Sequence, residues 1–272
     1  MPTVADVTAA VERLWPVAGI EPWDAVGLIA GDPADDVSSI HLAVDAVIET
    51  VDEAIDLGAS LLLVHHPLLL RGVTTVAADR YKGAVLTRLI RANCALLAAH
   101  TNADVVETGT SAVLADALGL TDQRPIVAST GNPSRGIGRI GVLPEPVTLG
   151  LVARRLAELL PATATGVRVA GEFDREIRTV ALCAGAGDAY LAHPAVLAAD
   201  VYVTSDLRHH PASEASENAR VGGGPALVDV SHWASEWLWL DTAAAELRAA
   251  LPGITVTVSD LRTDPWDFTV TQ

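Results

Sequence analysis

The chain has few cysteines, which crosslink small secreted proteins, and few basic residues, which bind nucleic acids. Its two cysteines, Cys94 and Cys183, both lie in apolar runs, so we expect buried free thiols in a reducing compartment and no disulfide scaffold. Basic residues are also scarce: the formal charge is 18 − 34 = −16, and Lys82 is the single lysine. Because an acidic surface repels phosphate groups, the composition argues against nucleic acid or an anionic membrane as a partner.

Long hydrophobic runs are absent as well. No apolar stretch approaches the roughly 20 residues that span a bilayer. The opening residues, MPTVADVTAAVERLWP, lack the basic and then apolar regions of a signal peptide. Apolar residues nevertheless make up 50% of the 272 residues, which is enough for a substantial core. We therefore expect a cytoplasmic α/β protein without a membrane segment.

Helical and strand patterns alternate along the whole chain, which is typical of βαβ units with a mostly parallel sheet. The expected helices are 4–14 (with Thr3 as N-cap), 47–57, 82–92, 110–118, 149–160 and one long helix over 232–250. The expected strands are 39–45, 60–64, 94–99, 139–143, 166–169, 179–183, 199–204, 226–230 and 254–259.

The two halves of the chain have a similar layout. Residues 121–137, rich in Pro, Gly, Ser and Thr, are predicted to be the linker between them. We therefore expect two similar, interleaved α/β domains, 1–125 and 135–272, which could also form one shared structural unit.

Apolar strands that end abruptly in His or Asp are the most informative feature. The run SLLLVHHP places His65 and His66 at the carboxyl end of a strand, and CALLAAHTNAD leads to Asp104. The run ALVDVSH ends at His232, and Glu236 follows four residues later on the same helix face. Open α/β sheets bind their ligands at this edge, so these five residues are the predicted metal ligands.

Five ligands with two carboxylates exceed what one tetrahedral zinc ion needs, and they suit two divalent ions about 3.5–4 Å apart. Nitrogen and oxygen donors without thiolate indicate Zn, Mn, Fe or Ni, and the sequence does not distinguish these metals. His100 and His209 are candidate proton carriers or supports of the metal ligands. A single histidine at a strand end is more often a hydrogen-bonded core or surface residue, and His209 with His210 also suits a solvated helix start.

At these residues the chain resembles the NIF-three-like family of dinuclear metal proteins, often labelled GTP cyclohydrolase 1 type 2 homologues. The matching segments are WDAVGLIAGDP, LLLVHHPLL, AAHTNAD, SDLRHHPASEA and VDVSHWASE. The resemblance implies the same five ligands, two similar α/β domains, a toroidal hexamer, and the short form of the family without an inserted domain. The chain departs from the family at Ser205, where Gly is common, and at Ala25, where Asn is common.

Two functions are compatible with these residues. The first is a metal-dependent hydrolase that acts on a nucleotide or related small molecule, because two ions activate water and stabilise developing charge. The family label points to the ring opening of GTP. The alternative is a non-catalytic metal-binding or metal-trafficking oligomer that serves as an interaction scaffold, and the same five ligands would serve either function.

Overall fold

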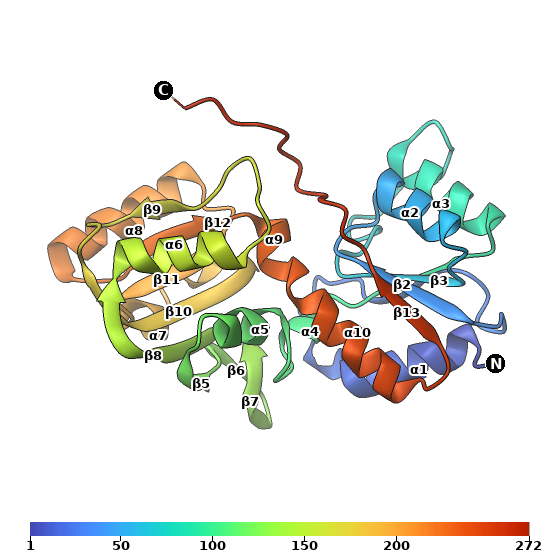
Figure 1. The fold of residues 1–272 in the computed structure, drawn as a ribbon, viewed down its shortest axis with the longest axis horizontal. Coiled ribbons are helices and arrows are strands. Elements are labelled where there is room, and N and C mark those ends of the chain that lie inside the picture. Colours follow the sequence, from blue (N-terminus) through green and yellow to red (C-terminus); the bar gives the residue numbers. More distant parts are fainter. Residues whose placement is uncertain (272) are drawn as a thin grey trace. The chain divides into compact units, whose positions relative to one another are not determined.

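The computed structural model describes residues 1–271, which form two compact units (Figure 1). The first unit comprises Met1–Ala103 and Leu240–Thr263, and the second comprises Asp104–Trp239 and the described residues from Asp264 onward. The chain thus returns to the first unit near its end. Among the helices of residues 1–271, none has the length and apolar character to cross a membrane.

The first unit contains a five-stranded sheet in the order β1-β4-β3-β2-β13. All neighbours are parallel except β1 and β4, so this sheet is mostly parallel as predicted. Its strands are β1 (Gly27–Ala30), β2 (Ser39–Ala43), β3 (Leu61–Val64), β4 (Ala95–Ala98) and β13 (Thr255–Val258). Its helical segments are α1 (Val4–Leu14), η1 (Val17–Gly19), α2 (Ile48–Asp56), α3 (Tyr81–Arg91) and most of α10 (Trp239–Ala250).

Continuous burial explains the apolar runs of this sheet. Every residue of β3 and β4 is buried, as expected for central strands covered on both faces. The helices of this unit bury one face, and α1 begins at the N-cap that the sequence predicts. In α1, Thr3 accepts a hydrogen bond from the backbone N–H of Asp6, and the Asp6 carboxylate accepts one from the backbone N–H of Thr3.

The second unit contains a six-stranded sheet in the order β5-β8-β10-β11-β12-β9. Its central pairs β10–β11 and β11–β12 are parallel and the other pairs are antiparallel, so this sheet is mixed. Its strands are β5 (Thr121–Arg124), β8 (Arg139–Thr148), β9 (Arg168–Ala170), β10 (Glu176–Ala186), β11 (Val201–Ser205) and β12 (Ala226–Val230).

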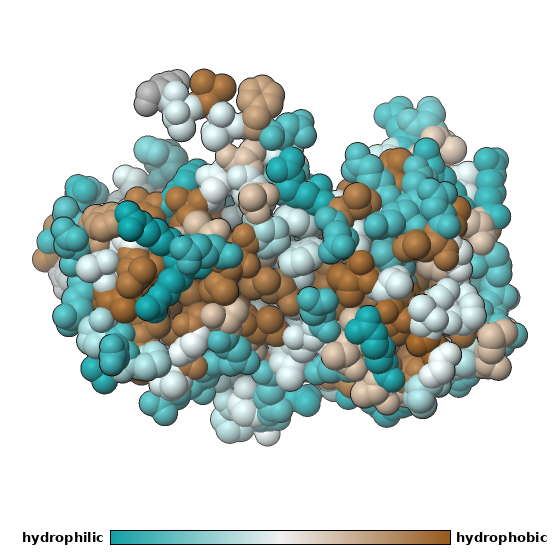
Figure 2. Space-filling model, in the orientation of Figure 1, coloured by the Kyte–Doolittle hydropathy of each residue, from teal (hydrophilic) through white to brown (hydrophobic). Residues whose placement is uncertain are grey.

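Several helical segments accompany this second sheet. They are α5 (Thr110–Ala117), α6 (Leu149–Leu159), η2 (Asp188–Tyr190), α7 (Pro194–Leu197), α8 (His209–Gly222) and α9 (His232–Trp237), and α4 (Thr101–Asp104) lies at the unit boundary. Apolar surface gathers over α6 in Figure 2, where Leu151 and Leu159 are partly exposed. Phe173 lies beside this helix, with the Arg154 guanidinium 5.5 Å from its ring centroid.

The predicted linker is wrong, because residues 121–137 are part of the second unit. Thr121–Arg124 pairs with β8, and β6 (Val127–Ser129) forms a two-stranded sheet with β7 (Asn132–Ile137). Gly131 has φ +84° between these two strands, a conformation that glycine adopts without strain. The strands are short and mostly polar, so they lack the alternation that identifies a strand from sequence.

The predicted long helix over 232–250 is also wrong in its continuity. It is divided into α9 and α10 at Leu238, and the two units divide just after it, between Trp239 and Leu240. Leu238 keeps helical angles (φ −56°, ψ −29°), so the interruption is in the hydrogen bonding and does not need a glycine or proline. The sequence HWASEWLWLD therefore contains no helix-breaking residue that would predict the interruption between α9 and α10.

Candidate metal centre

Three histidines come together in the first unit at the carboxyl ends of two parallel strands. His65 and His66 follow β3, and His100 follows β4, whose Ala98 pairs with Val64. The ring centroids of His65 and His66 are 5.1 Å apart, and His100 is 5.1 and 5.6 Å from them. One nitrogen from each ring lies within 4.8 Å of the others, a spacing at which the three rings could hold a metal ion.

Hydrogen bonds fix the orientation of all three rings. Nδ1 of His65 donates to the backbone oxygen of Ala99 (2.9 Å), because a carbonyl oxygen can only accept. Nδ1 of His66 donates to Asp45 (2.7 Å), and Nδ1 of His100 donates to Asp24 (2.8 Å). In the neutral ring the lone pair then lies on Nε2, which is the arrangement found around metal-ligating histidines.

Asp24 and Asp45, which accept the hydrogen bonds from His100 and His66, also accept hydrogen bonds from other residues. Asp24 accepts hydrogen bonds from the backbone N–H of Thr101 (3.0 Å) and from its hydroxyl (2.5 Å). Burial opposes ionisation of Asp24, but the hydrogen bonds from His100 and Thr101 outweigh it and hold its pKa well below the usual range. Asp45 accepts a hydrogen bond from the hydroxyl of Thr263 (2.5 Å). Asp24 is therefore an anionic acceptor at neutral pH.

The second unit carries the predicted histidine–carboxylate pair. His232 is the first residue of α9, which Ser231 caps through its side chain, and Nε2 of His232 lies 3.1 Å from Oε1 of Glu236. The Glu236 side chain is 4% exposed. On the other side of the ring, Nδ1 donates to Asp206 (2.7 Å). The i, i+4 spacing thus produces the contact that the sequence predicts.

The charges around His232 favour its protonated form. Burial by itself lowers the pKa of His232, but the carboxylates of Glu236 and Asp206 outweigh burial and raise it well above the ordinary value. In the metal-free protein a proton therefore lies between His232 and Glu236. A divalent cation in place of that proton would meet one nitrogen and one carboxylate oxygen as ligands.

Gly185 of β10 leaves the space that this pair occupies. A Cβ atom at this position would lie 2.3 Å from Oε1 of Glu236 and 3.2 Å from Nε2 of His232. Gly185 also has φ +70°, and its N–H donates to the hydroxyl of Ser235 (2.9 Å). The end of β10 therefore forms a cradle around the donor atoms that any side chain would fill.

Asp104, the remaining predicted ligand, is the last residue of α4 and is half-buried. It accepts a hydrogen bond from the hydroxyl of Thr110 at the start of α5 (2.5 Å). The negative charges of Asp104 and Glu236 both affect Cys183 in β10. Burial first, and then these two charges, raise the pKa of the Cys183 thiol far above its ordinary value. Both carboxylates therefore act on the same buried point of the second unit.

The structure thus brings His65, His66 and His100 together in the first unit, and it brings His232 and Glu236 together in the second. His100 belongs to the histidine cluster of the first unit, where it could be a donor as well as a proton carrier. His209 is exposed at the start of α8 beside His210, with ring centroids 5.1 Å apart, and its role stays a prediction.

Sequence reasoning missed the residues that support the ligands: Asp24, Asp45, Asp206 and Gly185. A signal was present for two of them. Asp45 and Asp206 follow strands β2 and β11 closely, just as the predicted ligands follow theirs.

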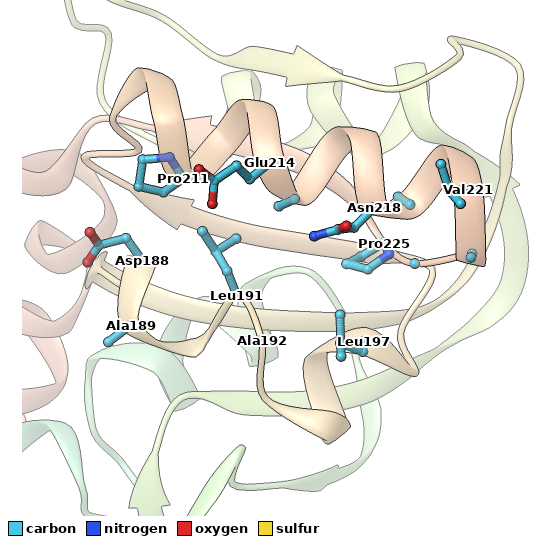
Figure 3. Close-up of a pocket in the computed structure, with 15 residues that line it drawn as sticks. Asp188, Ala189, Leu191, Ala192, Leu197, Pro211, Glu214, Asn218, Val221 and Pro225 are labelled. Carbon is cyan, nitrogen blue, oxygen red and sulfur yellow. The ribbon is translucent and has the colours of Figure 1, made fainter.

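A cavity of about 570 Å³ elsewhere in the second unit is a separate feature (Figure 3). It lies between α8 and the η2–α7 segment, with Asp188 and Glu214 at one end and Leu197 and Pro225 at the other. Its lining includes no predicted ligand among the described residues, and its carboxylate Asp188 is paired with Arg208 (2.7 Å). This cavity is therefore not part of the candidate metal centre.

The donor chemistry fits divalent transition metals. Four imidazoles have Nδ1 engaged by an acceptor, and two carboxylates, Asp104 and Glu236, lie in the second unit. Imidazole and carboxylate donors without thiolate are typical of Zn, Mn, Fe and Ni sites. The fold is thus an α/β protein of two units, and its strand ends carry side chains that could hold a metal ion.

The chain belongs to the Duf34/NIF3 (NGG1p interacting factor 3) family, whose model matches residues 2–265. A relative from Streptomyces coelicolor, named GTP cyclohydrolase 1 type 2 homolog, is 47% identical over 98% of this chain and 94% of its own. The family predicted from the sequence motifs is therefore confirmed.

Solved structures confirm the fold. A Bacillus cereus protein related to NIF3 has a TM-score of 0.90 with 23% identity, covering 98% of this chain and 99% of its own. A Staphylococcus aureus hypothetical protein has a TM-score of 0.88 with 26% identity over the same shares of the two chains. The α/β fold predicted from the alternating elements is that of these proteins.

Proposed function

We propose that the chain binds two divalent metal ions through His65, His66, Asp104, His232 and Glu236 and uses them to hydrolyse a nucleotide or a related small molecule. One observation carries the proposal: each histidine of the candidate set donates its Nδ1 proton to a fixed acceptor, so that Nε2 is the donor atom. A set of solvated surface histidines would not show the same anchoring at every ring.

The name of the Streptomyces coelicolor relative supports the substrate class. Full-length similarity at 47% identity to a protein named GTP cyclohydrolase 1 type 2 homolog makes guanine nucleotides the first compounds to test. The acidic composition is unfavourable for a nucleotide, and bound divalent ions would offset that charge locally. Arg71 follows the HHP segment and is exposed, whereas Arg208 is paired with Asp188. Arg71 is therefore the better candidate to meet a phosphate.

Bound divalent ions would supply a water of lowered pKa and stabilise negative charge on the reacting group. The chain's own residues would orient the ligands and move protons. His100 holds its Nδ1 proton against Asp24, so its Nε2 is available to accept a proton from a reacting group. This assignment makes His100 the proposed proton carrier of the first unit.

That the five ligands form one dinuclear centre stays a prediction from the family resemblance. X-ray absorption spectroscopy of the metal-loaded protein tests it directly. A metal–metal distance of about 3.5–4 Å would support one centre. Scattering from isolated ions alone would contradict it.

A nucleotide hydrolysis assay tests whether the protein is a hydrolase. The metal-loaded protein is incubated with GTP and other nucleotides, and ring opening is followed by absorbance and by formate release. Hydrolysis that is lost in Asp104→Ala supports the proposal. Tight metal binding without turnover of any nucleotide would reject it in favour of a non-catalytic metal-binding scaffold.

A further inference from the structure

Asp206 has an unusual backbone conformation for a residue with a side chain. It follows β11 immediately and has φ +58°, in the left-handed region. Among residues 1–271, Asn93 and Asp122 are the other non-glycine residues with positive φ. The left-handed region is costly for residues with a Cβ atom, and Asn and Asp tolerate it best. Such a conformation persists where the surrounding structure requires it.

The strand register explains what this conformation achieves. Strands β11 and β12 are parallel, and Ser205 pairs with Val230. Asp206 is therefore one residue beyond the paired end of β11, and His232 is two residues beyond the end of β12. At this point the Asp206 carboxylate accepts the Nδ1 proton of His232 at 2.7 Å. The chain therefore leaves strand β11 at Asp206, where the Asp206 carboxylate contacts the His232 ring.

A second cost accompanies the strained backbone. The N–H of Leu207, the next residue, donates to the buried Asp229 (3.3 Å). Burial raises the pKa of Asp229, the hydrogen bond from Leu207 and the charge of Arg168 oppose that rise, and the negative charge of Asp206 adds a smaller increase. Asp206 thus adds repulsion to a carboxylate on the neighbouring strand β12. A glycine at position 206 would avoid both the strained backbone and the repulsion.

We propose that Asp206 is a positioning residue for the metal ligand His232. The left-handed turn places its carboxylate on Nδ1, which fixes the ring and directs Nε2 at Glu236. The strained turn lowers the stability of the fold, and we infer that it is retained because it positions His232 and Glu236 for the metal. The inference rests on the proposed metal binding, and it assigns a role to a residue that does not itself touch the metal.

The experiment compares three variants with the wild-type protein. Asp206→Gly removes the acceptor and suits the left-handed backbone. Asp206→Asn keeps an acceptor oxygen and a tolerance for positive φ, but it lacks the charge. Asp122→Gly is the matched control, since Asp122 has φ +51° on exposed β5 of the same unit. Zn²⁺ affinity is measured by competition with a chelator, and the Tm of the metal-free protein is measured beside it.

We expect Asp206→Gly to weaken Zn²⁺ binding about 10–100-fold, with a metal-free Tm close to that of the wild type, because relief of the strained backbone offsets the lost hydrogen bond to His232. Asp206→Asn should recover part of the affinity, and Asp122→Gly should leave affinity unchanged. The absorption spectrum of the Co²⁺-loaded protein should change in Asp206→Gly and stay unchanged in the control.

Two results would overturn the inference while leaving the proposed function intact. One is wild-type Zn²⁺ affinity in Asp206→Gly. The other is a large loss of Tm in both Asp206 variants, which would show that the residue supports the fold. A wild-type protein that binds no metal at all would instead overturn the proposed function, and this inference with it.

Discussion

At the scale of single residues, the candidate centre depends on the space that Gly185 leaves beside Glu236. We predict that Gly185→Ala abolishes metal binding in the second unit, because the new Cβ would lie 2.3 Å from Oε1 of Glu236. Elemental analysis of the purified variant checks the loss.

The control for this substitution is Gly166→Ala. Gly166 also has positive φ (+58°), but a Cβ atom there would meet no heavy atom within 4 Å. Both variants carry the strain of an L residue at positive φ, so a difference in metal content between them reports the contact of the new Cβ atom with Glu236. Equal metal content in the two variants would contradict the role of Gly185.

The protonation of His232 predicts how pH affects the metal-free protein. Its pKa is raised in the folded state, so the contribution of His232 to stability is fully present below about pH 6.5, its unfolded pKa. That contribution is lost as pH rises through the folded pKa. The Tm difference between wild type and His232→Gln should therefore shrink as pH rises. A difference that grows with pH would contradict the assignment.

Metal affinity should show the opposite trend. A divalent ion must displace the proton that His232 shares with Glu236, so affinity rises with pH until the ring is neutral without metal. Calorimetric titrations with Zn²⁺ across about pH 6–9 measure this, and proton release should accompany binding. Binding that neither releases protons nor depends on pH would show that His232 is not a ligand.

Site residues could be predicted from the sequence where the interacting residues are close together along the chain. His65 with His66, and His232 with Glu236, are local pairs whose spacing alone places them together. Asp24 lies 76 residues before the His100 ring that it holds, so no local pattern connects them. The left-handed turn at Asp206 depends on the end of the neighbouring strand, which a single sequence does not show.

At the scale of elements, a buried polar chain joins the last strand of the first unit to its sheet and to α2. Nδ1 of His41 in β2 is 2.8 Å from the Thr257 hydroxyl in β13, and its Nε2 is 3.0 Å from Glu53 in α2. Glu53 also accepts a hydrogen bond from the Ser259 hydroxyl (2.5 Å). Because His41 is 1% exposed, its ring depends on these partners.

We predict that Glu53→Ala lowers the free energy of unfolding by about 1–3 kcal/mol, since it leaves buried polar groups without their acceptor. Urea unfolding of the metal-free protein measures it. Glu49→Ala, an exposed position on the same helix, is the control and should change stability by less than about 0.5 kcal/mol. An equally small effect of Glu53→Ala would contradict the importance of the chain.

Elements with a strong apolar period were predictable, and those held by pairing alone were not. Helix α1 and strand β12 have the predicted bounds because caps and continuous apolar runs mark them. Strands β5 to β7 are polar and gain their structure from their partners. The division of α9 from α10 coincides with the change from one compact unit to the other, a property of the fold that local helix propensity does not contain.

At the scale of the whole molecule, the family resemblance predicts a ring of six chains. Large apolar side chains remain exposed, including Phe173 at 56%, Trp266 at 61% and Phe268 at 80%, and subunit contacts would cover such surface. Sedimentation should give a mass about six times the 28.3 kDa of the chain. A monomer at micromolar concentration would contradict the ring.

The central claim is that this chain is a metal protein with two ions per chain. Elemental analysis of tag-free protein purified without chelator tests it most directly, beside Asp104→Ala. We predict about two divalent ions per chain in the wild type and fewer in the variant. One ion or none in the wild type, unrestored by added Zn²⁺, Mn²⁺ or Fe²⁺, would contradict the account.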